Sequence, residues 1–133
     1  MTKFETLHLD DAAQVVAPDG SQVRPLLQVA GGSMAVFELA PGLASQPVAH
    51  HNVDELWFFL SGRGEMWRRF EEHEETVEVR PSLCISIEAG TRFQFRCTGD
   101  EPLRALGVTM PPWPGAQEAY EVAGPWPVRL EQA

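Results

Sequence analysis

Frequent turn signals are the feature of this sequence that most limits its fold. Glycine, proline and small polar residues interrupt the apolar runs about every 8–12 residues, for example at Gly31-Gly32 and Pro41-Gly42. The 11 glycines and 11 prolines among 133 residues are more than a helical bundle would tolerate. The turns leave room for about eight to ten short strands and for no good amphipathic helix. We therefore predict an all-β sandwich or barrel that forms one domain over residues 1–133.

Several segments have the pattern expected of paired strands. Residues 92–97, RFQFRC, alternate with the period of two that a half-buried strand requires. The apolar runs 23–30 and 33–40 flank a pair of glycines and are predicted to form a hairpin. In the tail, Trp113 and Trp126 are each bracketed by prolines, so we expect them to anchor ordered loops on the surface by packing.

The run DELWFFL, residues 54–60, is predicted to be a strand that is buried on both faces. Alternate side chains of a strand point to opposite sides, so Glu55, Trp57 and Phe59 share one face. The other face carries three apolar residues, Leu56, Phe58 and Leu60. In a barrel the first face fills the interior. The second face needs a cover, either the interface of a homodimer or the chain's own N-terminal segment or tryptophan tail.

Charge and composition exclude several kinds of partner. The formal net charge is -9, whereas nucleic acids and anionic membranes are bound by basic surfaces, so neither is expected as a partner. No apolar segment follows a basic start, and no stretch approaches the roughly 18 apolar residues of a transmembrane helix. We therefore expect a cytoplasmic protein. Cys84 and Cys97 lack a metal-binding spacing, and in a reducing cytosol we expect two free thiols, buried or half-buried.

Two stretches of the chain resemble the motifs of the cupins. The first cupin motif runs G, about five residues, H-x-H, three or four residues, E, six residues, G, and it resembles residues 41–62. The matching residues there are Gly42, His50, His51, Glu55 and Gly62. The second motif runs G, five residues, P-x-G, two residues, H, three residues, N, and corresponds to residues 82–97. The resemblance implies a cupin-type double-stranded β-helix, a jelly-roll barrel that is usually dimeric, and it implies no single activity.

The resemblance also implies a metal site built from three histidines and one glutamate. The first motif can be aligned in two ways. With three residues before Glu55, its two histidine places fall on Ala49 and His51. With four residues before Glu55, they fall on Val48 and His50. Either alignment supplies one histidine of the two.

The third histidine place is Phe93, so two of the four ligand places lack a donor in either alignment. The candidate metal ligands are His50, His51 and Glu55. They could hold one divalent transition-metal ion (Zn, Fe, Mn, Ni or Cu) only if a bulge or loop turned both histidines inward. Otherwise one histidine hydrogen-bonds Glu55, the other lies at the rim, and no metal is bound. We expect His51 to be the partner of Glu55, and these two residues are the candidate catalytic acid and base.

The same strands predict an aromatic pocket beside Glu55. The inward-pointing aromatic residues would be Trp57, Phe59, Phe93 and Phe95. Such a pocket suits a small, partly apolar organic ligand, and the alternative is a barrel whose core is completely filled. Two functions remain open. One is an enzyme that acts on a small organic substrate and has a partly assembled metal site; the other is a metal-free, non-catalytic protein that binds a ligand or acts as a sensor.

Overall fold

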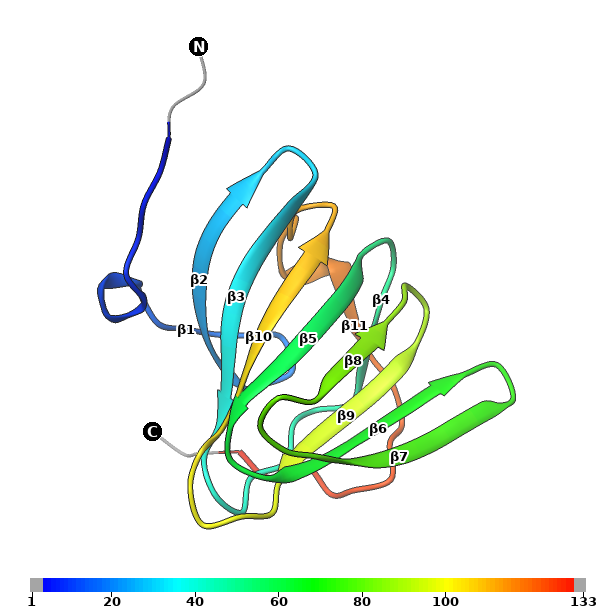
Figure 1. Cartoon of the computed structure of the whole chain (residues 1–133). Coiled ribbons are helices and arrows are strands. Elements are labelled where there is room, and N and C mark those ends of the chain that lie inside the picture. The colour runs from blue at the N-terminus through cyan, green and yellow to red at the C-terminus, as the bar shows by residue number, and fades with distance from the viewer. Residues whose placement is uncertain (1–3, 131–133) are drawn as a thin grey trace.

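Two antiparallel β-sheets make up most of the computed structural model, which describes residues 4–130. One sheet has six strands in the order β1-β2-β3-β10-β5-β8, and the other has five in the order β11-β4-β9-β6-β7 (Figure 1). The strands are β1 (Val15–Val16), β2 (Gln22–Val29), β3 (Gly32–Leu39), β4 (Val48–His50), β5 (Asp54–Ser61), β6 (Gly64–Phe70), β7 (His73–Val79), β8 (Cys84–Ile87), β9 (Arg92–Cys97), β10 (Leu103–Met110) and β11 (Ala119–Glu121). Between β4 and β10 the chain passes repeatedly from one sheet to the other. This is a jelly-roll barrel, and the predicted all-β fold is confirmed.

Helices are almost absent from the part of the chain that the structure describes. The two found there are three-residue 3-10 helices, η1 (Leu9–Asp11) and η2 (Ala116–Glu118). Within residues 4–130, no helix is long and apolar enough to cross a membrane. The short segments between turns therefore form strands, as their spacing predicts.

The turns lie where the glycine signals predict them. β2 and β3 pair as the hairpin expected around Gly31-Gly32. Gly62, between β5 and β6, has a φ of 81°, a conformation that glycine adopts far more readily than other residues. A side chain at this position would also collide with the backbone carbonyl of Pro102. Gly62 is therefore needed for the chain to cross between the sheets at this point.

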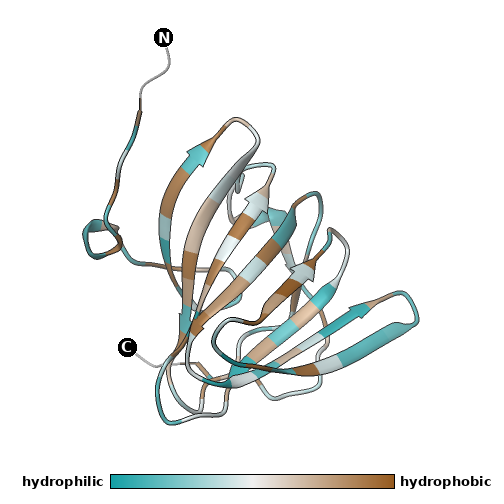
Figure 2. Cartoon of the chain, viewed as in Figure 1, coloured by the Kyte–Doolittle hydropathy of each residue, from teal (hydrophilic) through white to brown (hydrophobic). Residues whose placement is uncertain are grey.

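The alternation of side chains along β5 divides the strand into a buried face and an exposed face. Glu55, Trp57 and Phe59 point into the barrel and are at most 3% exposed. The outward residues are Leu56, Phe58 and Leu60, which are 53%, 41% and 41% exposed. Our expectation that both faces are buried is therefore wrong for a single chain. Neither the N-terminal segment nor the tryptophan tail covers the outer face (Figure 1), and the ribbon of β5 is largely apolar in colour (Figure 2).

The tail instead covers the outer side of the second sheet. Gln94 points away from Phe93 along β9, and its amide nitrogen donates hydrogen bonds to the carbonyl oxygens of Ser45 and Trp126. The backbone N–H of Trp126 donates to the Gln94 side-chain oxygen in return. The guanidinium of Arg96 lies over the Trp126 ring, 4.3 Å from its centre. Trp126 is thus an anchor of the tail, as its proline neighbours suggest.

Candidate ligand-binding site

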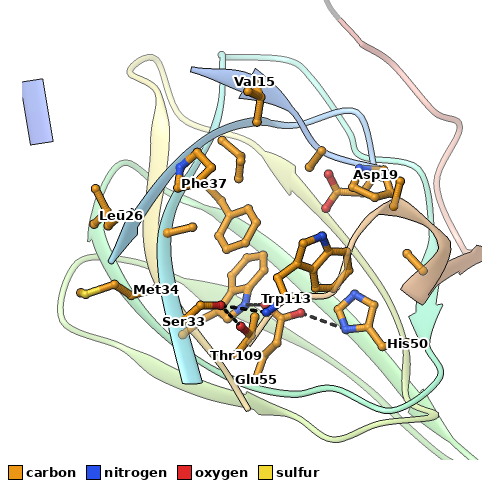
Figure 3. A pocket seen from close by; sticks show the side chains of 18 of the residues that line it. Val15, Asp19, Leu26, Ser33, Met34, Phe37, His50, Glu55, Thr109 and Trp113 are labelled. Carbon is orange, nitrogen blue, oxygen red and sulfur yellow. Dashed lines mark hydrogen bonds and ion pairs between the residues drawn. The ribbon is translucent and has the colours of Figure 1, made fainter. Parts of the chain in front are cut away.

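A cavity of about 340 Å³ lies between the two sheets. Its wall is mostly apolar and includes four aromatic side chains, Phe37, Trp57, Phe93 and Trp113. Its titratable side chains, among the described residues, are Asp19, His50 and Glu55. Figure 3 shows these three groups around the cavity together with the rings of Phe37 and Trp113. No lysine or arginine of residues 4–130 lines it. The barrel is therefore not completely filled.

Glu55 is held from two directions at the base of this cavity. The Trp57 indole N–H donates a hydrogen bond of 3.1 Å to Oε1 of Glu55. Nδ1 of His50 lies 3.0 Å from Oε2 of the same carboxyl group, and Figure 3 marks this pair. The direction of the His50–Glu55 contact is poor for a hydrogen bond, so this buried nitrogen has no hydrogen-bond partner among the described residues. The carboxyl group therefore sits between an indole and an imidazole with little contact with water.

Burial disfavours the charged form of both partners. Burial, together with the smaller effect of the Asp19 charge, raises the pKa of Glu55 from 4.5 to about 7, against the opposing effect of the Trp57 hydrogen bond. Burial lowers the pKa of His50 from 6.5 to about 4, and the charge of Glu118 opposes this only in part. Near neutral pH the imidazole is therefore uncharged, while Glu55 exists in both its protonated and its ionised form.

The imidazole beside Glu55 belongs to His50 and not to His51, which corrects our expectation. Adjacent residues of a strand point to opposite sides, so His50 at the end of β4 faces inward and His51 faces outward. The exposed His51 ring packs on Tyr120, with the ring centres 4.5 Å apart. The following loop is held by Glu118, whose carboxylate accepts a hydrogen bond from the backbone N–H of Val53. No bulge turns His51 into the barrel.

This geometry decides which cupin alignment applies. The inward residues of β4 are Val48 and His50, so four residues separate the last histidine place from Glu55. Val48 is paired with Phe93 across the sheet, and both line the cavity with His50 and Glu55. The cupin motifs assign four places to metal ligands. Two of them hold donors, His50 and Glu55, and the other two hold the hydrocarbon side chains of Val48 and Phe93.

The proposed metal set of His50, His51 and Glu55 does not converge, because His51 lies outside the barrel. Within residues 4–130, no group of three or more histidine, cysteine, aspartate or glutamate side chains is arranged to hold a metal ion. A firm transition-metal site needs about four ligands, or three and a water molecule. The residues present therefore do not fit a resident metal ion.

The predicted aromatic pocket is only partly correct. Trp57 and Phe93 line the cavity. Phe59 and Phe95 point into the barrel but do not reach the cavity, because they pack with Trp57 in the fully buried core. Their role is to close the barrel behind Trp57, whose ring also stacks on Phe37 at 4.8 Å.

The sequence interpretation missed two residues of the site. Asp19 lies in the turn between β1 and β2, where Asp19-Gly20 reads only as a turn signal, and no spacing relates it to Glu55. Trp113 follows β10, where we expected a surface anchor. Its ring instead meets the His50 ring edge-on, 5.0 Å between centres, and forms part of the cavity wall. Both residues reach the cavity through loops, which carry no periodic signal.

A jelly-roll barrel with a cavity between its sheets is the architecture of the cupin class. The model of the family Cupin_2, the cupin domain, matches residues 35–109 of this chain. The protein therefore belongs to the cupin domain family, and the resemblance seen in the two motifs is confirmed. Among curated proteins, no match to the chain is found.

Solved structures share the fold at low sequence identity. A Klebsiella pneumoniae protein with a double-stranded β-helix domain superposes with a TM-score of 0.70, at 13% identity, over 92% of this chain and 100% of that chain. A Streptomyces PAC13 variant solved with uridine gives 0.72 at 14% identity, over 92% of both chains. An oxalate decarboxylase of Lactobacillus farciminis in complex with formate gives 0.73 at 15% identity, over 92% of this chain and 38% of that chain. At such identity the likeness shows the fold alone.

Proposed function

We propose that this protein binds a small, mostly apolar organic molecule in its barrel cavity and exchanges a proton with it through Glu55. The observation that carries the proposal is that the cavity reaches Glu55, whose carboxyl group is held by Trp57 at the cavity wall. Side chains packed solidly against this carboxyl group would leave no room for a ligand beside it. Cavities of this size and composition suit small ligands, because apolar walls supply affinity and a few polar groups set orientation. Structures of the same fold were solved with ligands as different as uridine and formate.

The His50–Glu55 pair is suited to acid–base chemistry. A group with a pKa near the working pH both gives and takes a proton readily, and the pKa of Glu55 is about 7. His50 remains uncharged at that pH, because its pKa of about 4 makes it a weaker base than Glu55. Its buried Nδ1 lies 3.0 Å from the carboxyl group, so the imidazole positions Glu55, while Glu55 itself exchanges the proton with the ligand. We therefore propose Glu55 as the catalytic acid and base and His50, in place of His51, as the residue that positions it, and no metal ion takes part.

A non-catalytic, metal-free ligand-binding role is the second candidate. It is favoured by the contacts of Glu55, since one oxygen is already bonded to Trp57 and the other faces His50.

The catalytic and the non-catalytic function can be distinguished by incubating a library of small organic compounds with the protein and with E55Q. A compound consumed by the natural protein and not by E55Q supports proton transfer. Compounds that bind both forms and return unchanged support the binding role.

Filling the cavity is expected to abolish ligand binding. Ala35 lies on β3 and lines the cavity, so Ala35→Phe should occupy its volume and lower the affinity of any cavity ligand at least about 100-fold. Binding is measured by the change in tryptophan fluorescence or by calorimetry, with compounds found in a fragment screen. Val29→Phe, at the exposed end of β2, adds the same ring outside the cavity and should bind as the natural protein does. Equal affinity in A35F would place the ligand elsewhere.

We also propose that the outer face of β5 is covered by a second copy of this chain. Leu56 is paired with Val108 of β10, and Phe58 is paired with Leu106 of the same strand. The apolar surface therefore spans two neighbouring strands. These rows are uncharged, and in a chain of net charge -9 they are where two copies meet with least repulsion. The N-terminal segment runs away from the barrel (Figure 1) with Phe4 99% exposed, which leaves a further apolar group for a partner to bury.

A charge on this face is expected to separate the two copies. Phe58→Glu places a carboxylate in the proposed interface, and burying it there without a partner is costly, so sedimentation should give the mass of one chain where the natural protein gives two. The matched control is Phe70→Glu, because Phe70 is similarly exposed, at 47%, but lies on the β6–β7 hairpin. A natural protein that sediments as a single chain would contradict the proposal.

A further inference from the structure

We infer that the cavity selects an apolar molecule that carries an ammonium group, held between Asp19 and Glu55 and against the surrounding aromatic rings. This inference rests on the proposed function and names the class of its ligand. It also predicts that carboxylates of the same size are rejected. Asp19, which no cupin motif contains, is the recognition residue that the structure adds.

The charges around the cavity allow a cation and oppose an anion. Two carboxyl groups line it, and among the described residues no lysine or arginine does. His50 cannot supply the missing positive charge, because it is buried beside Glu55 and is uncharged near neutral pH. An anion entering this cavity would lose its water without gaining a positive partner, which is strongly unfavourable. The net charge of -9 also raises the concentration of cations near the protein.

Asp19 is a buried carboxyl group that lines the cavity and is paired with no positive charge among the described residues. It is only 5% exposed, and one oxygen, Oδ1, accepts hydrogen bonds from the backbone N–H and the hydroxyl of Ser21. Within residues 4–130, the only other hydrogen bond to this carboxyl group comes from the backbone N–H of Asp19 itself, and no side chain besides Ser21 donates to it. Figure 3 shows the carboxyl group at the border of the cavity, on a different side from Glu55. The two groups are close enough that the charge of Asp19 raises the pKa of Glu55.

The aromatic wall offers a second, independent attraction for a cation. Phe37, Trp57, Phe93 and Trp113 all line the cavity. The faces of aromatic rings carry negative charge density, and an ammonium group within about 6 Å of a ring centre is attracted to it, more strongly when water is excluded. A cavity that combines carboxyl groups with aromatic faces should bind an ammonium compound more tightly than the corresponding alcohol. A neutral hydroxyl group gains neither the attraction to a carboxylate charge nor the attraction to a ring face.

Proton release accompanies binding in this scheme. In the free protein, burial raises the pKa values of both Asp19 and Glu55. The pKa of Glu55 is about 7, so this group keeps part of its protons near neutral pH. A positive charge placed beside them favours their ionised forms, and the proton leaves to the solvent. A neutral ligand brings no such charge and releases no proton. The number of protons released therefore reports the charge of the ligand separately from its affinity.

The test compares three ligands with the same aromatic body. Binding of 2-phenylethylamine, 2-phenylethanol and phenylacetate is measured by calorimetry at pH 7 in two buffers that differ in ionisation enthalpy. We expect the amine to bind at least roughly ten-fold more tightly than the alcohol, phenylacetate to bind too weakly to measure, and only the amine to release protons. Asp19→Asn should reduce the affinity for the amine to that for the alcohol and leave the alcohol unaffected. Glu55→Gln should remove most of the proton release.

Two controls make the result specific to the cavity. Asp100→Asn removes one negative charge from an exposed turn and should leave all three affinities unchanged, so a loss in D19N is not a loss of net charge. Thermal unfolding tests whether D19N is folded. We expect that it is, because the side-chain oxygen of asparagine can still accept the two hydrogen bonds from Ser21.

The outcomes separate the inference from the proposed function. Equal or tighter binding of the alcohol or of phenylacetate, blocked by A35F, overturns the ammonium assignment and leaves a small-molecule cavity standing. Failure of all three compounds, together with a fragment screen that finds no A35F-sensitive binder, overturns both. Amine binding that D19N leaves unchanged also contradicts the assignment, because Asp19 would then contribute nothing to recognition.

Discussion

Replacing Val48 and Phe93 together by histidine is expected to turn the base of the cavity into a metal centre. The variant V48H/F93H should bind about one Zn²⁺ or Ni²⁺ ion per chain, whereas the natural protein should hold none after purification without chelator. Val48 and Phe93 are direct partners across the β4–β9 pairing, and both line the cavity with His50 and Glu55. The substitution raises the donors there from two to four, the number that tetrahedral transition-metal sites use.

The V48H/F93H variant should be much less stable than the natural protein without metal and should regain much of that stability when metal is bound. Without metal, the variant loses Phe93 from the core, a change that typically costs about 3–5 kcal/mol. A metal ion present at 1,000 times its dissociation constant then raises the free energy of unfolding by about 4 kcal/mol. Thermal unfolding with and without Zn²⁺ measures both effects, and elemental analysis gives the stoichiometry.

The matched control is V48L/F93L, which loses the same aromatic ring but gains no donor. It should be destabilised in a similar way and be unaffected by Zn²⁺. One equivalent of tightly bound metal in the natural protein, lost in His51→Ala, would contradict the geometry, because His51 packs on Tyr120 outside the barrel.

The second large effect concerns the pH dependence of stability. His50 has a lower pKa in the folded protein, about 4, than its ordinary value of 6.5, so its contribution to stability is lost as the pH falls from about 6.5 to 4. Glu55 has a higher pKa in the folded protein, about 7, than its ordinary 4.5, so its contribution is lost as the pH rises from about 4.5 to 7. In the natural protein these opposing trends largely cancel over the range they share.

Single substitutions should reveal each trend alone. E55Q should lose stability on acidification through this range, and H50N should lose stability as the pH rises through it, each by an amount on the order of 2–3 kcal/mol. Urea unfolding followed by tryptophan fluorescence at a series of pH values gives the two slopes. The double variant E55Q/H50N is the reference, since it keeps Asp19 and Glu118 and lacks only the pair. Identical slopes in E55Q and in the double variant would show that burial does not depress the pKa of His50.

Much of the fold could be predicted because its signals are local. The spacing of turns and the alternation in RFQFRC reflect how a strand buries one face, and this depends only on near neighbours in the sequence. The inward direction of Glu55 follows from the same alternation along β5, and the structure bears it out. The spacing of Gly42, Glu55 and Gly62 was enough to indicate the cupin barrel, which the family match confirms.

The composition of the site could be predicted only in part. Trp57 and Phe93 line the cavity, but whether an inward ring lines a cavity or fills a core depends on what packs opposite it. For Phe59 and Phe95 the opposing groups come from other strands, so their sequence neighbourhood contains no information about this. The same holds for the outer face of β5, which we propose is covered by a second copy of the chain.

By itself the sequence determined the strands, the barrel and the inward carboxyl group of Glu55, because each of these depends on periodicity over a few residues. Only the tertiary structure decided which of two adjacent histidines faces Glu55, since that depends on how β4 pairs with β9 and β11. It also brought Asp19 and Trp113 to the cavity. Loops have no repeating pattern, and contacts between residues far apart in the chain arise only when the sheets close around a common interior.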